Sequence, residues 1–176
     1  MLRTFKGKAR PNVRIGINYK IHSDKKIDMD LKWRIKRFEA LSVIELYKVL
    51  QLRSEVFVVE QNCVYQDLDG KDLKALHLIG EDNGQTIAYA RLFKPNDYFI
   101  DASIGRVVVK QSSREKKVGH ILMQQAIEGI KTQFGASKIT ISAQLYLKKF
   151  YENHGFIQTS DIYLEDDIPH IEMKKS

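Results

Sequence analysis

The sequence contains one cysteine, Cys63, among 176 residues. A single thiol excludes an intramolecular disulfide and any cysteine-based zinc site, which agrees with a reducing compartment. The chain also lacks an apolar run of membrane-spanning length, and its first residues lack the continuous apolar block of a secretory signal. No internal repeat is visible. From these absences we expect a soluble, cytoplasmic protein without a membrane partner.

Positive charge is present, but it gathers at one end of the chain. Residues 1–37 hold twelve Lys and Arg against three Asp, a balance of +9, whereas the whole chain carries +7, so that the remainder carries −2. A whole-protein argument for nucleic-acid binding therefore fails, and we expect no nucleic-acid partner. The change in composition predicts a basic N-terminal extension at residues 1–28 and one domain at residues 29–176.

Apolar residues alternate with others in the extension from Val13 to Ile21, a pattern typical of a β-strand. We expect that removing the extension leaves a complete domain. The alternative is a basic arm that touches an acidic partner, RNA or a membrane face. Residues 1–23 lack acidic residues, as an organelle-targeting presequence does, but such a presequence would be richer in serine.

Hydrophobic periodicity predicts an α+β domain with one mixed, mostly antiparallel sheet of about seven strands, flanked by about four helices. Strand patterns occur at residues 31–36, 77–81, 86–93, 104–110, 138–143, 156–163 and 170–174, and helical patterns at 43–57, 118–134 and 147–155. Ser42 and Glu45 have the spacing of a capping box at the start of the first helix, Asn83-Gly84 is a hairpin turn signal, and Gly135 should end the helix at 118–134. A helix separates the strands at 104–110 and 138–143. These two strands should therefore be parallel neighbours joined by a right-handed crossover.

The stretch from Ile104 to His120 joins a β-branched strand to the start of a helix through a polar turn. The first N–H groups of a helix have no intrahelical partner, and the positive end of the helix dipole lies beside them. Such a turn suits a phosphate. A turn rich in Lys and Arg is also common on an ordinary solvated surface, so the prediction depends on the surrounding motifs.

The turn reads Arg114-Glu-Lys-Lys117-Val118-Gly119, and it resembles the pyrophosphate loop of the GNAT superfamily of N-acetyltransferases, (Gln or Arg)-x-x-Gly-x-(Gly or Ala). Lys117 stands where the first glycine usually does, so this position must reach its backbone conformation without glycine's tolerance of positive φ. Lysine also adds charge beside the phosphates.

Further motifs extend the resemblance from about residue 33 to the end of the chain. The order of elements and the motif Leu147-x-x-Phe150-Tyr151-x-x-x-Gly155-Phe156 are similar to the cofactor half of a GNAT enzyme. The segment from Val49 to Asp69 and the ending Asp167-Ile-Pro-His170-Ile resemble the ElaA branch of that superfamily.

The resemblance implies a splayed pair of central parallel strands that holds acetyl-coenzyme A as co-substrate. The backbone of Val107 to Val109 would pair with the pantetheine chain, and an N–H there would face the thioester oxygen. Gln144, just past a strand end, would reach the pantetheine amides or the substrate; its alternative role is to cap a loop. The cofactor-binding residues expected on this basis are Val107, Val108, Val109, Arg114, Lys116, Lys117, Val118, Gly119, His120 and Gln144.

Acetyl transfer to an amine requires a neutral amine, a donor for the oxyanion and a proton for the departing thiolate. Tyr151 is the expected proton donor, because a phenol is neutral at pH 7; its alternative is an aromatic residue packed on the sheet. Glu60, which follows an apolar run, is the preferred base. A water chain, His77 or His170 are alternatives, although each histidine is more often structural. The expected substrate-binding residues are Glu60, Tyr65, His77 and His170.

Acidic residues gather in two places. Asp67, Asp69 and Asp72 lack the spacing and terminal glutamate of an EF-hand, so we expect them to order a loop or recognise an amine without a metal. An acidic rim would attract a cationic amine, although solubility explains its charges equally well. The rim would consist of Glu60, Asp67, Asp69, Glu165, Asp166 and Asp167.

These patterns predict an N-acetyltransferase that moves an acetyl group from acetyl-CoA to the amine of a small molecule or peptide by direct attack on the thioester. An acyltransferase similar to acyl-homoserine lactone synthases and a non-catalytic acyl-CoA-binding module are the alternatives. The sequence leaves open the acceptor, the base and the oligomeric state, for which a homodimer is one option.

Overall fold

The computed structural model describes residues 30–176, so the predicted extension at residues 1–28 lies outside the described part. One eight-stranded sheet has the order β1-β2-β3-β4-β5-β8-β6, and β7 pairs with β8 beside this path. The strands are β1 (Leu31–Arg37), β2 (Leu76–Asp82), β3 (Gln85–Phe93), β4 (Ala102–Val109), β5 (Ile139–Gln144), β6 (Ile157–Gln158), β7 (Tyr163–Glu165) and β8 (Ile168–Lys175). The predicted α+β class is confirmed, with the strand expected at 156–163 divided into β6 and β7.

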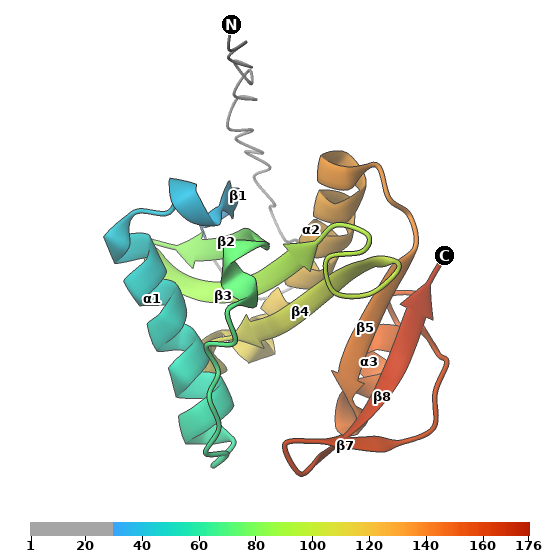
Figure 1. Ribbon diagram of the computed structural model, residues 1–176. Coiled ribbons are helices and arrows are strands. Elements are labelled where there is room, and N and C mark those ends of the chain that lie inside the picture. Colours follow the sequence, from blue (N-terminus) through green and yellow to red (C-terminus); the bar gives the residue numbers. More distant parts are fainter. Residues whose placement is uncertain (1–29) are drawn as a thin grey trace, which may run out of the picture.

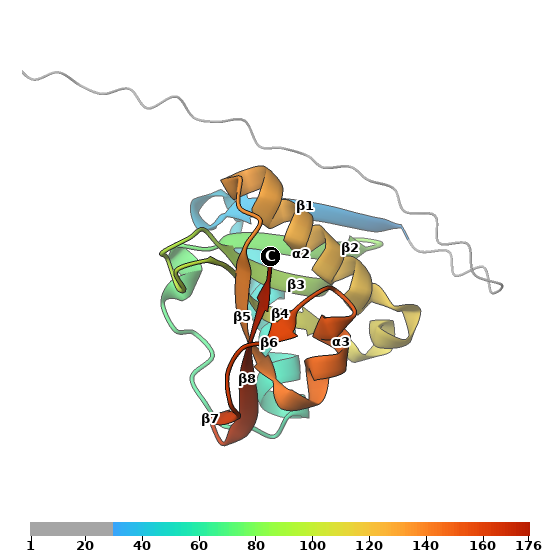
Figure 2. The same cartoon turned by 90° about the vertical axis from the view of Figure 1, so that its right-hand side faces the viewer.

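Three α-helices cover the sheet from both sides: α1 (Val43–Arg53), α2 (Val118–Phe134) and α3 (Lys148–Glu152). Alternating side chains of β3 decide which helix lies on which face, because successive residues of a strand point to opposite sides. Ala88, Ala90 and Leu92 belong to the larger core with α2, whereas Tyr89 packs with Val49 of α1. Figures 1 and 2 show α1 on one face of the sheet and α2 with α3 on the other.

The capping box predicted at the start of α1 is present. The Ser42 Oγ accepts from the Glu45 N–H at 3.2 Å, and the Ser42 N–H donates to the Glu45 carboxylate at 2.9 Å. Burial acts to raise the pKa of Glu45, but hydrogen bonds from Lys36 and Ser42 outweigh it and lower the pKa to about 2. The helix continues beyond α1 as a π-helical segment, η2 (Ser54–Glu60), three residues past the predicted end at Phe57.

The turn between β2 and β3 also follows from local sequence. Asn83 and Gly84 both have positive φ, at 49° and 78°. This pair of left-handed residues is the tight hairpin turn that Asn-Gly favours. At the other end of the sheet, α2 ends where Gly135 takes the left-handed conformation, as predicted.

The feature that positions the site is the separation of β4 from β5. These strands are parallel, as predicted, but only Ala102–Ile139 and Ser103–Thr140 are paired. Beyond them β5 pairs with β8 on its other side through Gln144. Figure 1 shows β4 and β5 diverging toward the end of the sheet that α1 and β7 also approach. Within residues 30–176, no strand therefore pairs with the side of β4 that faces β5 from Ile104 onward.

Among the described residues, no helix combines the length and apolarity needed to cross a bilayer.

Candidate active site

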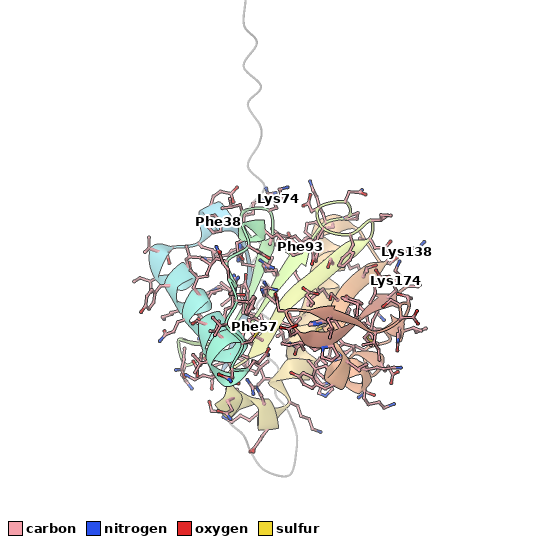
Figure 3. All side chains as sticks on the ribbon, turned by 60° about the horizontal axis from the view of Figure 1, so that its bottom comes forward. Phe38, Phe57, Lys74, Phe93, Lys138 and Lys174 are labelled. Atoms are coloured by element: carbon pink, nitrogen blue, oxygen red, sulfur yellow. The ribbon has the colours of Figure 1, made fainter. Side chains whose placement is uncertain are left out.

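A pocket with a volume of about 120 Å³ opens where β4 and β5 separate. Its lining comes from η2 and the loop after it, β3 and the loop that follows, β4, β5, the turn at Leu147, α3 and the β7–β8 hairpin. Phe57 of η2, labelled in Figure 3, contributes one aromatic wall beside β4. The pocket brings together five of the residues predicted for the site, Tyr65, Val107, Gln144, Tyr151 and His170.

A β-bulge shapes the β4 wall of the pocket. Tyr89 pairs with Val108 and Arg91 with Gly105, so that Arg106 and Val107 face Ala90 alone. Arg106 has φ 48°, in the left-handed region that residues with a side chain rarely adopt. A bulge leaves one extra residue without a partner in the ladder of hydrogen bonds and bends the strand. In β4 this bend lies where the pocket begins.

Alternation along β4 determines which of the three predicted valines faces the open side. The Lys110 N–H donates to Ile87 of β3 at 2.8 Å. Backbone groups of alternate residues point to the same side, so Val108 also faces β3, whereas Val107 and Val109 face the open side. The Val108 side chain is buried against α1. The expectation that Val108 binds the cofactor through its backbone is therefore corrected.

Tyr151 of α3 lines the pocket and is 6% exposed. Its ring packs edge-on against Phe150 and Phe156, with centroid distances of 5.1 and 6.1 Å. Burial raises the pKa of the Tyr151 phenol, so the group keeps its proton at and well above neutral pH. Packing and proton donation, the two roles weighed for this tyrosine, are thus compatible.

The predicted phosphate turn is a short 3₁₀ segment, η4 (Gln111–Lys116), followed directly by α2. Lys117 has φ 58° and ψ 20°, so it adopts the left-handed conformation for which glycine is usual. The N–H groups of Val118 and Gly119 donate to no acceptor among residues 30–176, whereas the His120 N–H donates to the Lys117 carbonyl at 3.0 Å. The positive end of α2 therefore presents two backbone N–H donors that have no partner among the described residues.

Glu60 lies outside the pocket lining. Its carboxylate accepts from Arg114 Nη2 at 2.5 Å, and Arg114 Nε donates to the Val109 carbonyl at 3.0 Å. The predicted base and the predicted phosphate-binding arginine are thus joined to each other. The ion pair ties the end of η2 to the phosphate turn.

His77 is completely buried, and both of its ring nitrogens have partners. Nε2 lies 3.0 Å from the Asp72 carbonyl, which can only accept, and Nδ1 lies 2.8 Å from the Tyr89 hydroxyl. Burial lowers the pKa of His77, which favours the neutral ring. The structure therefore gives this histidine buried structural partners and places it outside the pocket lining.

His170 differs, because it lines the pocket. Its Nδ1 lies 2.8 Å from the Ile168 carbonyl and must carry the hydrogen of that bond. In the neutral ring Nε2 is then unprotonated. The ring stacks on Tyr163 at a centroid distance of 6.2 Å, which fixes its orientation.

Arginines bind half of the six residues of the predicted acidic rim, Glu60, Asp67 and Asp69, and also bind Asp72. Arg53, Arg91 and Arg106 bind Asp67, Asp69 and Asp72 at distances from 2.7 to 3.3 Å. These aspartates order the loop and are not available to attract an amine. Sequence reasoning missed the arginines, although two of them, Arg91 and Arg106, stand in strand-like apolar runs where a buried charge requires a partner.

Two further pocket residues, Gln61 and Cys63, were also missed, and Glu165, which was expected as part of the acidic rim, lines the pocket as well. Gln61 accepts from Gln144 Nε2 at 3.2 Å, which joins the η2 loop to β5 across the pocket. Glu165 accepts from the Ser142 hydroxyl at 2.8 Å, and Cys63 contributes a thiol to the lining. In the part of the chain that the structure describes, no group of three His, Cys, Asp or Glu side chains is placed to hold a metal ion.

Comparisons with known proteins agree with this geometry. The model of the acetyltransferase (GNAT) domain matches residues 43–176. Protein ElaA of Escherichia coli (strain K12) is 42% identical over 147 residues, which cover 82% of this chain and 96% of that protein. A UPF0039 protein of Schizosaccharomyces pombe is 44% identical over 147 residues, covering 82% of this chain and 97% of that protein.

Solved structures are similar over the same region. The crystal structure of Escherichia coli ElaA has a TM-score of 0.77 at 41% identity and covers 83% of this chain and 99% of that chain. An acyl-CoA N-acyltransferase from Pseudomonas aeruginosa has a TM-score of 0.77 at 41% identity, covering 82% of this chain and 99% of that chain. This protein belongs to the GNAT acetyltransferase family, in which acyl-CoA is the co-substrate.

Proposed function

We propose that this protein transfers the acetyl group of acetyl-CoA to the primary amine of a small molecule or peptide. The observation that carries the proposal is the separation of β4 from β5, with the protonated Tyr151 phenol in the resulting pocket. The pocket would hold the thioester end of acetyl-CoA, and the free N–H groups at the start of α2 would hold its pyrophosphate.

The residues present fit acetyl-CoA. Its pyrophosphate matches the N–H groups of Val118 and Gly119, at the positive end of a 17-residue helix, with Lys116 and Lys117 beside them. Its pantetheine chain matches the open side of β4, where an added strand pairs with backbone groups. The Val109 carbonyl already accepts from Arg114, so the main pairing position is Val107.

The chemistry follows from these positions. The amine nitrogen attacks the thioester carbon, and the Val107 N–H stabilises the negative charge that develops on the oxygen. The carbon–sulfur bond then breaks, and Tyr151 gives its proton to the leaving thiolate. His170 Nε2 accepts the proton that the attacking amine loses.

The β7–β8 hairpin recognises the acceptor in this proposal. Glu165 and Asp166 line the pocket, and neither forms an ion pair with a described Lys, Arg or His side chain. Because Asp67 and Asp69 are neutralised, these two carboxylates hold the negative charge of the pocket. We infer that the acceptor carries a second positive charge, as a diamine or a lysine-like compound does.

The test is a screen of diamines, lysine-like amines, neutral amines and acidic amines for release of free CoA from acetyl-CoA, with mass spectrometry of the acetylated product. We expect transfer to the cationic amines. If none of the amines is acetylated although the protein binds acetyl-CoA, the binding-module alternative is favoured.

Glu165→Gln and Asp166→Asn should each raise the KM for a cationic amine by about 2- to 5-fold, because each removes one partly exposed attractive charge. The KM for acetyl-CoA should not change. Steady-state kinetics in low and high salt measure this, since screening should reduce the difference between wild type and variants. An equal rise in KM for a neutral amine would contradict a charge effect. Asp161→Asn, which alters an exposed carboxylate outside the pocket, is the control.

Lys117 combines a charge with a left-handed backbone, and two substitutions separate these contributions. Lys117→Gly should raise the free energy of unfolding by up to about 1 kcal/mol, because glycine adopts this conformation without steric cost. Lys117→Gln retains the steric cost of the left-handed conformation, because glutamine has a side chain. Both should weaken CoA binding by about 2- to 5-fold through loss of an exposed charge. Urea unfolding and calorimetric titration with CoA measure the two effects, and unchanged affinity in both variants would remove Lys117 from the phosphate site.

A further inference from the structure

The bulge residue Arg106 is held in an unfavourable backbone conformation by its own side chain. Its φ of 48° is rare for any residue other than glycine. The guanidinium donates through Nε to Asp67 Oδ1 at 2.7 Å and through Nη2 to the Asp67 carbonyl at 3.4 Å. It also lies 5.8 Å from the centroid of the Phe57 ring and 5.6 Å from that of Tyr65. The side chain is therefore fixed on two sides.

Asp67 is fixed in turn by groups that do not belong to β4. Its Oδ2 accepts from Arg53 Nε at 2.8 Å, and its Oδ1 accepts from the Tyr65 hydroxyl at 3.1 Å. Asp67 is 6% exposed and Arg53 is completely buried at the end of α1, where Nη1 also binds Asp72 at 2.7 Å. A continuous series of buried, charge-assisted hydrogen bonds thus runs from a helix to the bulge.

The bulge is the part of β4 that presents Val107 to the pocket. The hydrogen bond from Arg106 Nε to Asp67, at 2.7 Å, is the shortest contact of this side chain, and without it only the Phe57 and Tyr65 rings and the longer contact with Asp69 would oppose a change of the Arg106 backbone. The strand would then relax toward regular pairing with β3. A regular register moves every following backbone group by one position, which turns the Val107 N–H away from the pocket.

We propose that Asp67 is a positioning residue for acyl transfer, which acts through Arg106 to hold the bulge with the Val107 N–H aimed at the thioester oxygen. The inference rests on the function proposed above. It assigns to Asp67 a role at the reacting centre that goes beyond ordering its own loop.

Asp69 provides a matched control two residues away. It accepts hydrogen bonds from Arg91 through both carboxylate oxygens, at 2.7 and 2.9 Å. Its contact with Arg106 is longer, with 3.6 Å between Asp69 Oδ2 and Arg106 Nη2. Asp69 therefore fastens the same loop to β3 with little hold on the bulge. Asp67→Asn and Asp69→Asn change the same functional group in the same segment.

The experiment measures the affinity of the full chain for acetyl-CoA and for CoA by calorimetry, without an acceptor. Only acetyl-CoA has the thioester oxygen, so the ratio of the two dissociation constants reports on the donor at the bulge. In Asp67→Asn the preference for acetyl-CoA should fall by about 3- to 10-fold, the effect of one hydrogen bond, while CoA affinity stays unchanged. In Asp69→Asn both affinities should stay as in the wild type.

Arg106→Ala tests the same link with less risk to folding. Alanine retains the steric cost of the left-handed conformation, and Asp67 keeps its bonds to Arg53 and Tyr65, so only the contact that holds the bulge is lost. The preference for acetyl-CoA should fall as it does in Asp67→Asn. Arg106→Gly removes that contact and the steric cost together, so it should keep the wild-type preference. Arg106→Lys, which retains the charge but not the planar guanidinium, should have a preference between those of Arg106→Ala and the wild type.

The outcomes separate this inference from the proposed function. A wild-type protein that binds neither acetyl-CoA nor CoA would overturn the proposed function and the inference with it. A wild-type protein that binds both, with the same ratio in Asp67→Asn, Asp69→Asn and Arg106→Ala, would overturn the positioning role alone. A loss confined to Asp67→Asn and Arg106→Ala supports it.

Discussion

Replacing Tyr151 with Phe is expected to lower turnover by about 100-fold or more, because proton transfer to the leaving thiolate is a general-acid contribution of that size. The substitution removes one hydroxyl and keeps the ring that packs on Phe150 and Phe156. The affinity for acetyl-CoA and the stability of the fold should therefore change little.

The pH dependence gives a second measurement of the same group. Burial raises the pKa of the Tyr151 phenol above its ordinary value. The wild-type rate should then not fall as the pH rises through about 10, where an unperturbed tyrosine loses its proton. A decline in that range that is absent from Tyr151→Phe would show that the phenol ionises normally.

Tyr47→Phe is the matched control, since Tyr47 is 66% exposed on α1 and does not line the pocket. Its turnover should equal that of the wild type. Turnover in Tyr151→Phe within about 3-fold of the wild type would fall short of the range for general-acid catalysis and would leave the tyrosine with a packing role only.

Replacing Arg53 with Met is expected to reduce the free energy of unfolding by about 3–5 kcal/mol. Arg53 is completely buried, and its guanidinium binds Asp67 at 2.8 Å and Asp72 at 2.7 Å. Methionine matches much of the side-chain volume but leaves two buried carboxylates without this partner. The cost is the free energy of an uncompensated buried charge, not of a cavity.

Urea unfolding measures the loss as a lower midpoint at unchanged slope. Lys149→Met makes a comparable substitution at an exposed ion pair with Glu152, whose side chains lie 3.6 Å apart, and should cost less than about 1 kcal/mol. Arg53→Lys should fall between the two, because it keeps the charge without the planar fork. Equal midpoints for Arg53→Met and Lys149→Met would show that the buried network adds no stability.

Local patterns in the sequence determined the elements and their order. The Ser42–Glu45 capping box, the Asn83-Gly84 turn and the Gly135 helix end depend on residues within a few positions of one another, and each is found where it was predicted. The parallel relation of β4 and β5 also followed from the helix between them. The phosphate turn could be placed because its residues are consecutive.

The tertiary structure decided what the charged residues do. Arg114 and Glu60 are 54 residues apart, and Arg106 and Asp67 are 39 apart, so no local pattern indicates that either pair meets. The burial of His77 and the neutralisation of Asp67, Asp69 and Asp72 depend on the same packing of loop against sheet. Periodicity shows which face of an element is apolar, but the partner of a buried charge is set by how distant segments pack together. The sequence alone therefore predicted the fold and the position of the phosphate turn, whereas the tertiary structure determined the bulge in β4, its contact with Asp67 and the lining of the pocket.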